Sequence, residues 1–214
     1  MITIKKCRIC QSPKLKEIIN LGEMALTGVF PSKPCKMKKY PIILIECKKC
    51  KLVQLKHQFN KITLFGDNYG YRSGLNKSMV VHLNEIVRNI EKRVKITDAD
   101  VVMDIGSNDG TLLKAYKYGQ RMGYEPIIKF HKYYPKNIQV WPYFFPESTP
   151  LFKCKVITSI AMFYDLKDPL KFMMAIKNCL EPNGIWVFEV AHWPTTVKNT
   201  SYDTICHEHA CYYD

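Results

Sequence analysis

The sequence predicts an α/β fold, a parallel, doubly wound sheet preceded by a small cysteine-rich module. Two observations lead to it. From residue 101 to residue 190, short apolar runs alternate with helical patterns, and the first run enters a glycine-rich turn. Two CxxC motifs lie within residues 1–61. Strands that alternate with helices are typical of a parallel sheet covered on both faces. We therefore expect a module at 1–61, a linking loop and helix at 62–100, and an α/β domain at 101–214.

The first strand of the α/β domain should be 101–105, read VVMDI, followed by the turn GSNDG and a helix over 111–118. Glycines let a ligand approach the backbone, and a helix start offers free N–H groups. Glu125 stands 21 residues after Asp104, where an acid can accept hydrogen bonds from two ribose hydroxyls. The expected ligand-binding residues are Asp104, Gly106, Ser107, Asn108, Asp109, Gly110 and Glu125.

The spacing of this turn decides between nucleotide classes. A dinucleotide site usually reads G-x-G-x-x-G, which is absent here. The turn instead resembles the S-adenosylmethionine loop of class I methyltransferases. The alternative is a tight turn without a ligand, and it is disfavoured because turn and acid occur together at the right separation.

The rest of the domain should supply strands at 138–141, 156–160 and 185–190 and a helix at 170–180. Ligands of such sheets bind beyond the carboxyl ends of the strands. The loop after the third strand can place Phe144 against an adenine, although packing explains this aromatic loop equally well. Ser159 lies where the fourth strand should meet the ligand.

In the N-terminal module, Cys7 and Cys10 form one CxxC motif and Cys47 and Cys50 the other, with 36 residues between them. Two such motifs supply the four thiolates of a tetrahedral zinc site. Disulfides are disfavoured in a reducing compartment, and a redox CxxC needs a βαβ setting that is missing. We expect structural zinc. Cys35 has no matching partner.

The charge distribution limits the possible partners, and the lack of targeting signals limits the possible compartment. Residues 1–60 hold 13 Lys and Arg against three acids, so most of the net charge of +13 belongs to the module. The excess is either a phosphate-binding patch or solvated lysines; 27 Lys against five Arg favours the second reading. The sequence shows no secretory signal and no apolar run of about 18 residues, so we expect a cytoplasmic protein without a membrane span.

Two further stretches are candidates for the reaction site. The loop 67–74, read DNYGYRSG, carries two tyrosines that suit a lid or a substrate contact, or equally a domain junction. Near the end, His207, Glu208 and His209 form an HEH motif. Adjacent metal ligands on a helix point apart, so general base chemistry is the better functional reading. The alternative is that the motif is exposed on the surface and has no catalytic role.

The motifs occur in a fixed order: CRIC, CKKC, YGYRSG, VVMDIGSNDGTLL, GYEP, ITSIAMFYDLKDP, GIWVFEV and SYDTICHEHACYY. Together they resemble the sugar C-methyltransferase family, S-adenosylmethionine-dependent enzymes that act on nucleotide-linked keto-sugars. The resemblance covers nearly the whole chain. It implies an N-terminal zinc-binding domain and a Rossmann-like class I methyltransferase domain.

The resemblance also implies roles for individual residues. The four CxxC cysteines match zinc ligands, and the glycine turn with Glu125 matches the cofactor site. His209 matches the base that removes a proton beside the sugar ketone, Glu208 its neighbouring acid, and Tyr71 a tyrosine of the lid loop. Where many members have a histidine after the fourth strand, this chain has Tyr164 and Asp165.

Relative to that family, the chain ends early, at Asp214. We therefore expect the last strands of the sheet and a further domain to be missing, with a separately encoded C-terminal half as a partner that completes an otherwise inactive chain. Two other function classes remain. An RNA-modifying methyltransferase predicts salt-sensitive RNA binding, which the lysine-rich composition makes less favoured. A non-catalytic zinc-containing interaction protein predicts no stabilisation by S-adenosylmethionine.

Overall fold

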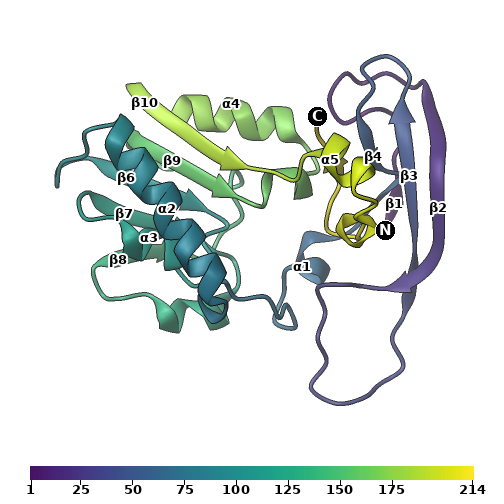
Figure 1. Ribbon diagram of the computed structural model, residues 1–214, viewed down its shortest axis with the longest axis horizontal. Helices are drawn as coiled ribbons and strands as arrows, with labels where there is room; N and C mark the ends of the chain where they lie inside the picture. Colours follow the sequence, from purple (N-terminus) through teal and green to yellow (C-terminus); the bar gives the residue numbers. More distant parts are fainter. The chain divides into compact units, whose positions relative to one another are not determined.

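The computed structural model describes all 214 residues, which form two compact units (Figure 1). Unit 1 comprises Met1–Gly70, Ala161–Leu170 and Glu189–Asp214, and unit 2 comprises Tyr71–Ile160 and Lys171–Phe188. The chain thus leaves unit 1, builds most of unit 2, and returns to unit 1 twice. This division differs from the expected boundaries, because two segments of the expected domain at 101–214 join the N-terminal module.

Unit 2 is built on a five-stranded sheet with the order β10-β9-β6-β7-β8. The strands are β6 (Val101–Ile105), β7 (Gln120–Tyr124), β8 (Ile138–Trp141), β9 (Cys154–Ile160) and β10 (Leu180–Glu189). Val102 pairs in parallel register with Arg121 on one side and Val156 on the other. The predicted parallel sheet is confirmed, and its strand order reverses at β6, where ligands of open α/β sheets bind.

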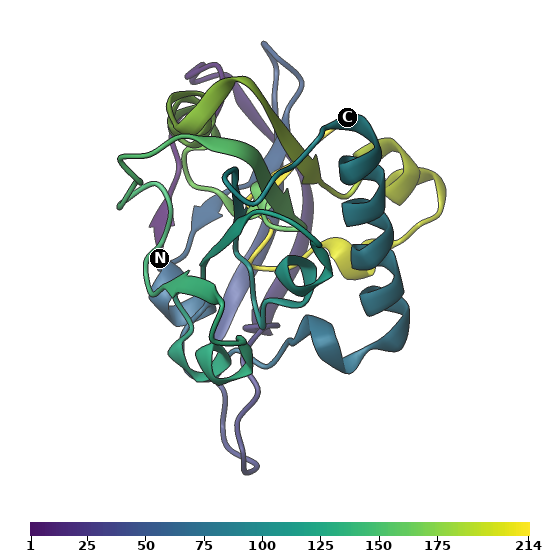
Figure 2. The same ribbon diagram turned by 90° about the vertical axis from the view of Figure 1, so that its left-hand side faces the viewer.

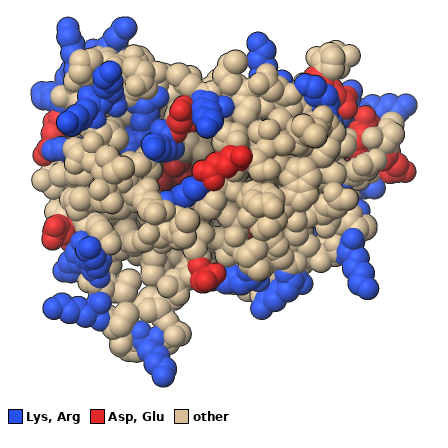
Figure 3. Space-filling model, turned by 180° about the vertical axis from the view of Figure 1, so that it is seen from behind, with Lys and Arg blue, Asp and Glu red and all other residues tan.

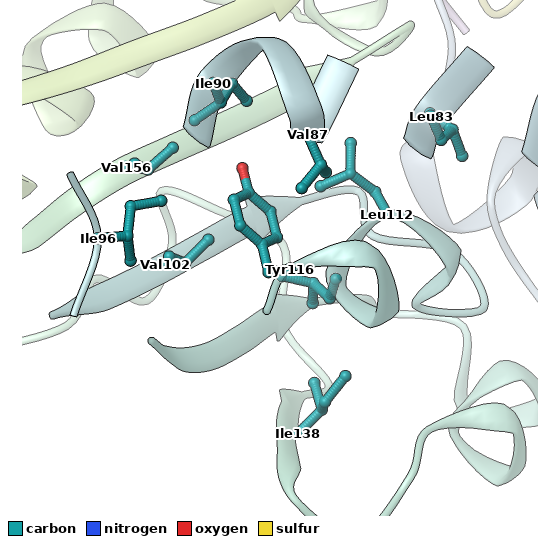
Figure 4. Close-up of a cluster of buried hydrophobic side chains, with 10 residues drawn as sticks. Leu83, Val87, Ile90, Ile96, Val102, Leu112, Tyr116, Ile138 and Val156 are labelled. Atoms are coloured by element: carbon teal, nitrogen blue, oxygen red, sulfur yellow. The ribbon is translucent and has the colours of Figure 1, made fainter. Parts of the chain in front are cut away.

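Helices cover both faces of this sheet. Figure 2 shows α2 (Lys77–Arg93) and α4 (Pro169–Cys179) on opposite sides of it. The helix expected within 62–100 is α2, and its apolar side chains pack into a core with α3 (Thr111–Ala115) and the sheet (Figure 4). Its buried members include Leu83, Val87, Ile90, Val102, Leu112, Tyr116 and Val156. On the α4 face, Phe172 packs against Phe145 and Trp186.

The helix α3 is shorter than the predicted 111–118. It ends at Ala115 because Tyr116 takes an extended conformation, with φ −67° and ψ 135°. That conformation turns the chain so that the Tyr116 side chain, 2% exposed, enters the core. A short helix after the glycine turn is sufficient to present its N-terminus.

Unit 1 is built on an antiparallel sheet with the order β11-β4-β3-β2. Its strands are β2 (Leu15–Ala25), β3 (Lys39–Cys47), β4 (Val53–Leu55) and β11 (Cys211–Tyr212), and a separate pair joins β1 (Ile2–Thr3) to β5 (His57–Gln58). The pairing of Cys211 with Gln54 brings the end of the chain onto the N-terminal module. The core of this sheet contains Ile42, Leu44, Val53, Leu55, Ile205 and Tyr212.

Short helices complete unit 1. They are α1 (Lys61–Leu64), α5 (Trp193–Lys198) and the single 3-10 turns Phe163–Asp165 and Tyr202–Thr204. Unit 2 has two further 3-10 turns, Ser73–Leu75 and Ile128–Tyr133. None of the helices combines the length and the apolar character that a bilayer crossing requires. Lys and Arg side chains form several separate groups on the face seen in Figure 3.

Candidate functional site

The four cysteines of the two CxxC motifs converge in unit 1. All four Sγ atoms lie within 4.8 Å of one another, with 3.6 Å between Cys7 and Cys50 and 3.5 Å between Cys10 and Cys47. A disulfide would place two sulfurs at about 2.0 Å, whereas four sulfurs around one zinc ion at bonds of about 2.3 Å stand further apart. The donor set and its spacing therefore fit zinc.

The two cysteine motifs fold alike. The Cys7 N–H donates to Ser12 O and the Cys47 N–H to Leu52 O, both at 2.9 Å. Four residues after each first cysteine the backbone is left-handed, with φ 58° at Gln11 and 68° at Lys51. Each turn thereby aims its two thiols at the same point.

The thiol acidities also fit a bound cation. Burial would raise the pKa of Cys47, but the backbone amides of Cys50 and Lys49 and the neighbouring thiols lower it to about 6. Burial, and then the three nearby sulfurs, raise the pKa of Cys50 to about 12. Four thiolates this close repel one another unless a metal ion neutralises them.

In unit 2 the glycine-rich turn connects β6 to α3. Its backbone is left-handed at three residues, with φ 70° at Gly106, 53° at Asn108 and 72° at Gly110. At position 110 a side chain would also collide with the Tyr134 ring, because a Cβ there would lie 2.9 Å from it. The turn therefore needs glycine there, and it places Gly106–Gly110 against the end of β7.

Two buried acids flank this turn. The Glu125 carboxylate accepts from the Asn108 N–H and the Ile127 N–H, both at 2.8 Å. Asp104 accepts from the Thr158 hydroxyl at 2.6 Å. Burial raises the pKa of both acids to about 7. Each Glu125 oxygen keeps a second lone pair, so the carboxylate can still accept from ligand hydroxyls.

The turn is also held by the tyrosine loop at the start of unit 2. Asn108 accepts from the Ser73 N–H at 2.9 Å and donates to the Tyr71 carbonyl at 3.1 Å. Asp109 accepts from the Gly74 N–H at 3.0 Å. The side chain of Tyr71 is 45% exposed, so the loop contacts the turn through its backbone and leaves this phenol accessible.

For two of the predicted cofactor-binding residues, Ser159 and Phe144, the structure shows other contacts. Ser159 is fully buried, and its hydroxyl accepts from Trp186 Nε1 at 2.9 Å. That bond gives Ser159 a packing role on the α4 face. Phe144 is half-buried in the loop after β8, and its carbonyl accepts from the Glu147 N–H. Contacts of both residues with a cofactor stay predictions.

The HEH motif lies in unit 1, where its two histidines have different surroundings. His209 Nδ1 lies 2.8 Å from the Thr204 carbonyl. Since a carbonyl only accepts, Nδ1 carries the proton and Nε2 keeps its lone pair. Burial lowers the pKa of His209. This imidazole is therefore neutral near pH 7 and can act as a base through Nε2.

His207 is packed as a structural residue instead. It is 2% exposed, donates from Nε2 to the Tyr40 carbonyl at 3.2 Å, and meets the Phe59 ring edge-on at 5.0 Å between centroids. Its environment is an aromatic core, with no further polar partner for Nδ1. His209 is the more accessible of the two histidines, because it is half-buried whereas His207 is almost fully buried.

Glu208 is held by the turn that follows β2. Its carboxylate accepts from the Thr27 hydroxyl through one oxygen and from the Gly28 N–H through the other. The residue is 7% exposed. Nothing in the sequence pattern indicates these partners, because 180 residues separate Gly28 from Glu208.

The segment after β9 supplies two more side chains to this cluster. The Tyr164 ring packs on the His209 ring, with 4.3 Å between centroids. Burial, and then the negative charge of Glu208, raise the pKa of Asp165 well above its usual range. The chain reaches these positions through Ala161, whose φ is 53°. The sequence signal for Asp165 is its place after the fourth strand, where the family resemblance leads one to expect a histidine.

Comparisons with known proteins agree with this architecture. Residues 7–65 match the family described as "Putative zinc binding domain", and residues 80–214 match the family described as "Methyltransferase domain". The C-methyltransferase NovU of Streptomyces niveus is 24% identical over 98% of this chain. The match covers 53% of NovU, so the chain spans about half the length of that relative.

Solved structures share the fold of this chain. One is a chain of the "Complex between the Haloferax volcanii Trm112 methyltransferase activator and the putative methyltransferase", with a TM-score of 0.52, 17% identity, and 66% of this chain and 67% of that chain covered. Another is the plantazolicin methyltransferase BpumL in complex with a triazolic desmethylPZN analog and SAH, with a TM-score of 0.50, 13% identity, and 60% and 54% covered. The sheet order and these likenesses define the class I methyltransferase fold.

Proposed function

The chain belongs to the family with this methyltransferase domain, and from that premise we propose that it is an S-adenosylmethionine-dependent C-methyltransferase of nucleotide-linked keto-sugars. The similarity to NovU supports methylation at carbon. Since the chain spans about half of that relative, its activity alone and its substrate are both part of the proposal. The cytoplasm is the compartment we propose, since it holds both the cofactor and nucleotide-linked sugars.

The observation that carries the proposal is the tautomer of His209. A ketone acidifies the neighbouring C–H bond, and a base with a free lone pair and a pKa near or below neutrality can remove that proton. His209 meets both requirements, because the Thr204 carbonyl holds Nδ1–H and burial lowers the pKa of the imidazole. His207 also has an unpartnered ring nitrogen and a pKa lowered by burial, but it is 2% exposed. His209 is only half-buried, so it is the histidine that a substrate can reach.

The proton balance follows from this arrangement. Nε2 of His209 takes the proton from the carbon beside the ketone, and the C–H electron pair becomes the enolate. Hydroxyl donors stabilise the enolate oxygen, and the exposed phenol of Tyr71 is the candidate that the sequence indicates. The enolate carbon then forms its new bond to the methyl group while the bond from that methyl to the sulfonium sulfur breaks and its electron pair stays on the sulfur. His209 later returns its proton to solvent. Glu208 orients the sugar by accepting from a hydroxyl.

Unit 2 supplies the cofactor residues in this proposal. S-adenosylmethionine, when bound, provides a methyl group on a positive sulfur, which an enolate carbon can attack. The Gly106–Gly110 turn lets the ligand approach the backbone, and Glu125 accepts from the ribose hydroxyls. Asp104, Asn108 and Asp109 keep the turn in shape through the hydrogen bonds described above. Ser107 does so through a hydrogen bond between its hydroxyl and that of Tyr134, at 2.7 Å. Zinc, held by the four cysteines, has a structural role.

A transfer assay tests the proposal. The protein is incubated with S-adenosylmethionine and a panel of nucleotide-linked 3-keto and 4-keto sugars, and products are followed by mass for the gain of one methyl group. His209→Asn should lose at least about a hundredfold in rate, as expected for removal of a general base. His82→Asn, on α2, is the matched control and should keep wild-type rates.

A protein that binds the cofactor but methylates none of these sugars contradicts the substrate assignment. Full activity in His209→Asn contradicts the assignment of the base. Tight RNA binding that falls steeply with salt would instead favour an RNA-modifying enzyme.

A further inference from the structure

The turn that follows β2 grips the carboxylate of Glu208 from the zinc-binding part of unit 1. The Thr27 hydroxyl donates to Oε2, and the Gly28 N–H donates to Oε1 at 2.5 Å. Two donors on two different oxygens fix both the position and the plane of the carboxylate. Each oxygen retains a lone pair for another partner.

The turn is itself firmly placed. Leu26 is 8% exposed and belongs to a small core with Phe59 and Leu64. Two residues beyond Thr27, Val29 forms an antiparallel bridge with Tyr69. The chain on both sides of the turn is therefore anchored by contacts that do not involve Glu208. The turn keeps its position without Glu208 and can hold the carboxylate in place.

A side chain at position 28 would displace the Glu208 carboxylate. A Cβ there would lie 2.5 Å from Glu208 Oε1 and 3.2 Å from a ring carbon of Tyr69. The backbone thus approaches the carboxylate as closely as its N–H allows. Both donors are neutral groups, and both come from the turn that follows β2.

We propose that Thr27 is a positioning residue of the reaction, which together with the Gly28 amide holds Glu208 in the orientation that binds the sugar. The inference rests on the proposed function for the role of Glu208, and on the hydrogen bonds for the contact itself. It makes the zinc-binding part of the chain a contributor to substrate orientation as well as to folding.

Thr27→Val tests the proposal, because valine keeps the shape of threonine and removes the donor. The expected result is a fall of at least about tenfold in kcat/KM, the factor that follows from losing one charge-assisted hydrogen bond. Thr27→Ser keeps the hydroxyl and should return to within about twofold of wild type. Affinity for S-adenosylhomocysteine, measured by calorimetry, should be unchanged in both. Thr63→Val, an exposed threonine on α1, is the control.

A double-mutant cycle with Glu208→Gln measures the contact without any substrate. If Thr27 bonds to Glu208, the melting-temperature shifts of the two single variants should not add in the double variant. Additive shifts overturn the inference, as does wild-type kcat/KM in Thr27→Val. Equal defects in Thr27→Ser and Thr27→Val also overturn it, since the hydroxyl would then not matter. If the wild-type chain methylates no keto-sugar, the proposed function fails and the cycle alone decides the inference.

Discussion

Arg8 and Gln54 are joined by two hydrogen bonds, since the backbone N–H and Nη1 of Arg8 both donate to Gln54 Oε1, at 3.1 and 3.3 Å. Nη1 also donates to the Leu55 carbonyl at 2.7 Å. Gln54 pairs in register with Cys211, and the Leu55 N–H donates to the Ala210 carbonyl at 3.0 Å. The first cysteine motif is thereby connected through β4 to the chain that directly follows His209.

Replacement of this arginine tests that connection. Arg8→Lys keeps the charge but lacks the planar fork that reaches several acceptors, so buried Gln54 would lose a partner. We expect a loss of about 2 kcal/mol in the free energy of unfolding, measured by urea denaturation. Arg88→Lys, on the exposed face of α2, should change stability by less than about 0.5 kcal/mol. Equal stability of both variants would show that the Arg8 bonds contribute nothing.

Removal of the metal should unfold the cysteine motifs and disturb the HEH segment. We expect about one zinc ion per chain, measured by metal analysis. Cys47→Ser should lose that ion and melt at a lower temperature, because the metal supplies folding free energy. Cys35→Ser, which changes an exposed cysteine outside the cluster, should keep both the metal and the melting temperature. Full zinc content in Cys47→Ser would contradict the four-cysteine site.

Glu125 should set the affinity for the cofactor and its pH dependence. Since burial raises the pKa of Glu125 to about 7, the carboxylate becomes protonated as the pH falls through that value and loses acceptor strength. Affinity for S-adenosylhomocysteine, measured by calorimetry, should therefore weaken below pH 7. Glu125→Gln should weaken it about tenfold at pH 8. Glu85→Gln, on the exposed face of α2, should bind normally, and an unchanged Kd in Glu125→Gln would refute the ribose contact.

Asp165 should make the protein less stable as the pH rises. Its folded-state pKa lies well above the unfolded value of about 3.9, so the native state binds the proton more tightly. Stability is then full below the unfolded pKa and declines as the pH rises toward the folded pKa. Asp165→Asn mimics the neutral acid. Its melting temperature should exceed that of wild type at pH 8 and match it more closely at pH 5; the reverse order would contradict the raised pKa.

Local features of the fold were predictable from the sequence. The strand at 101–105, the turn after it and the helix within 62–100 depend on neighbours a few residues apart, and all three occur as expected. The four cysteines were also predictable, since the metal chemistry of two CxxC motifs brings them together whatever the chain does between them.

Long-range contacts were not predictable in the same way. The strand β2 was not predicted, because its side chains are mostly exposed and do not alternate clearly between apolar and polar. The pairing of β11 with β4 joins residues more than 150 positions apart, and nothing in a two-residue strand indicates it. The sequence likewise does not mark Thr27, because only the fold brings its hydroxyl to Glu208.

The central claim is that His209 serves C-methylation of a keto-sugar, and the fate of a labelled methyl group tests it most directly. The protein is supplied with S-adenosylmethionine carrying ¹³C in its methyl group, and the product sugar is examined by NMR. The account predicts the label on the carbon beside the ketone, present with wild type and absent with His209→Asn. Label on a sugar oxygen, or equal labelling by His209→Asn, would contradict it.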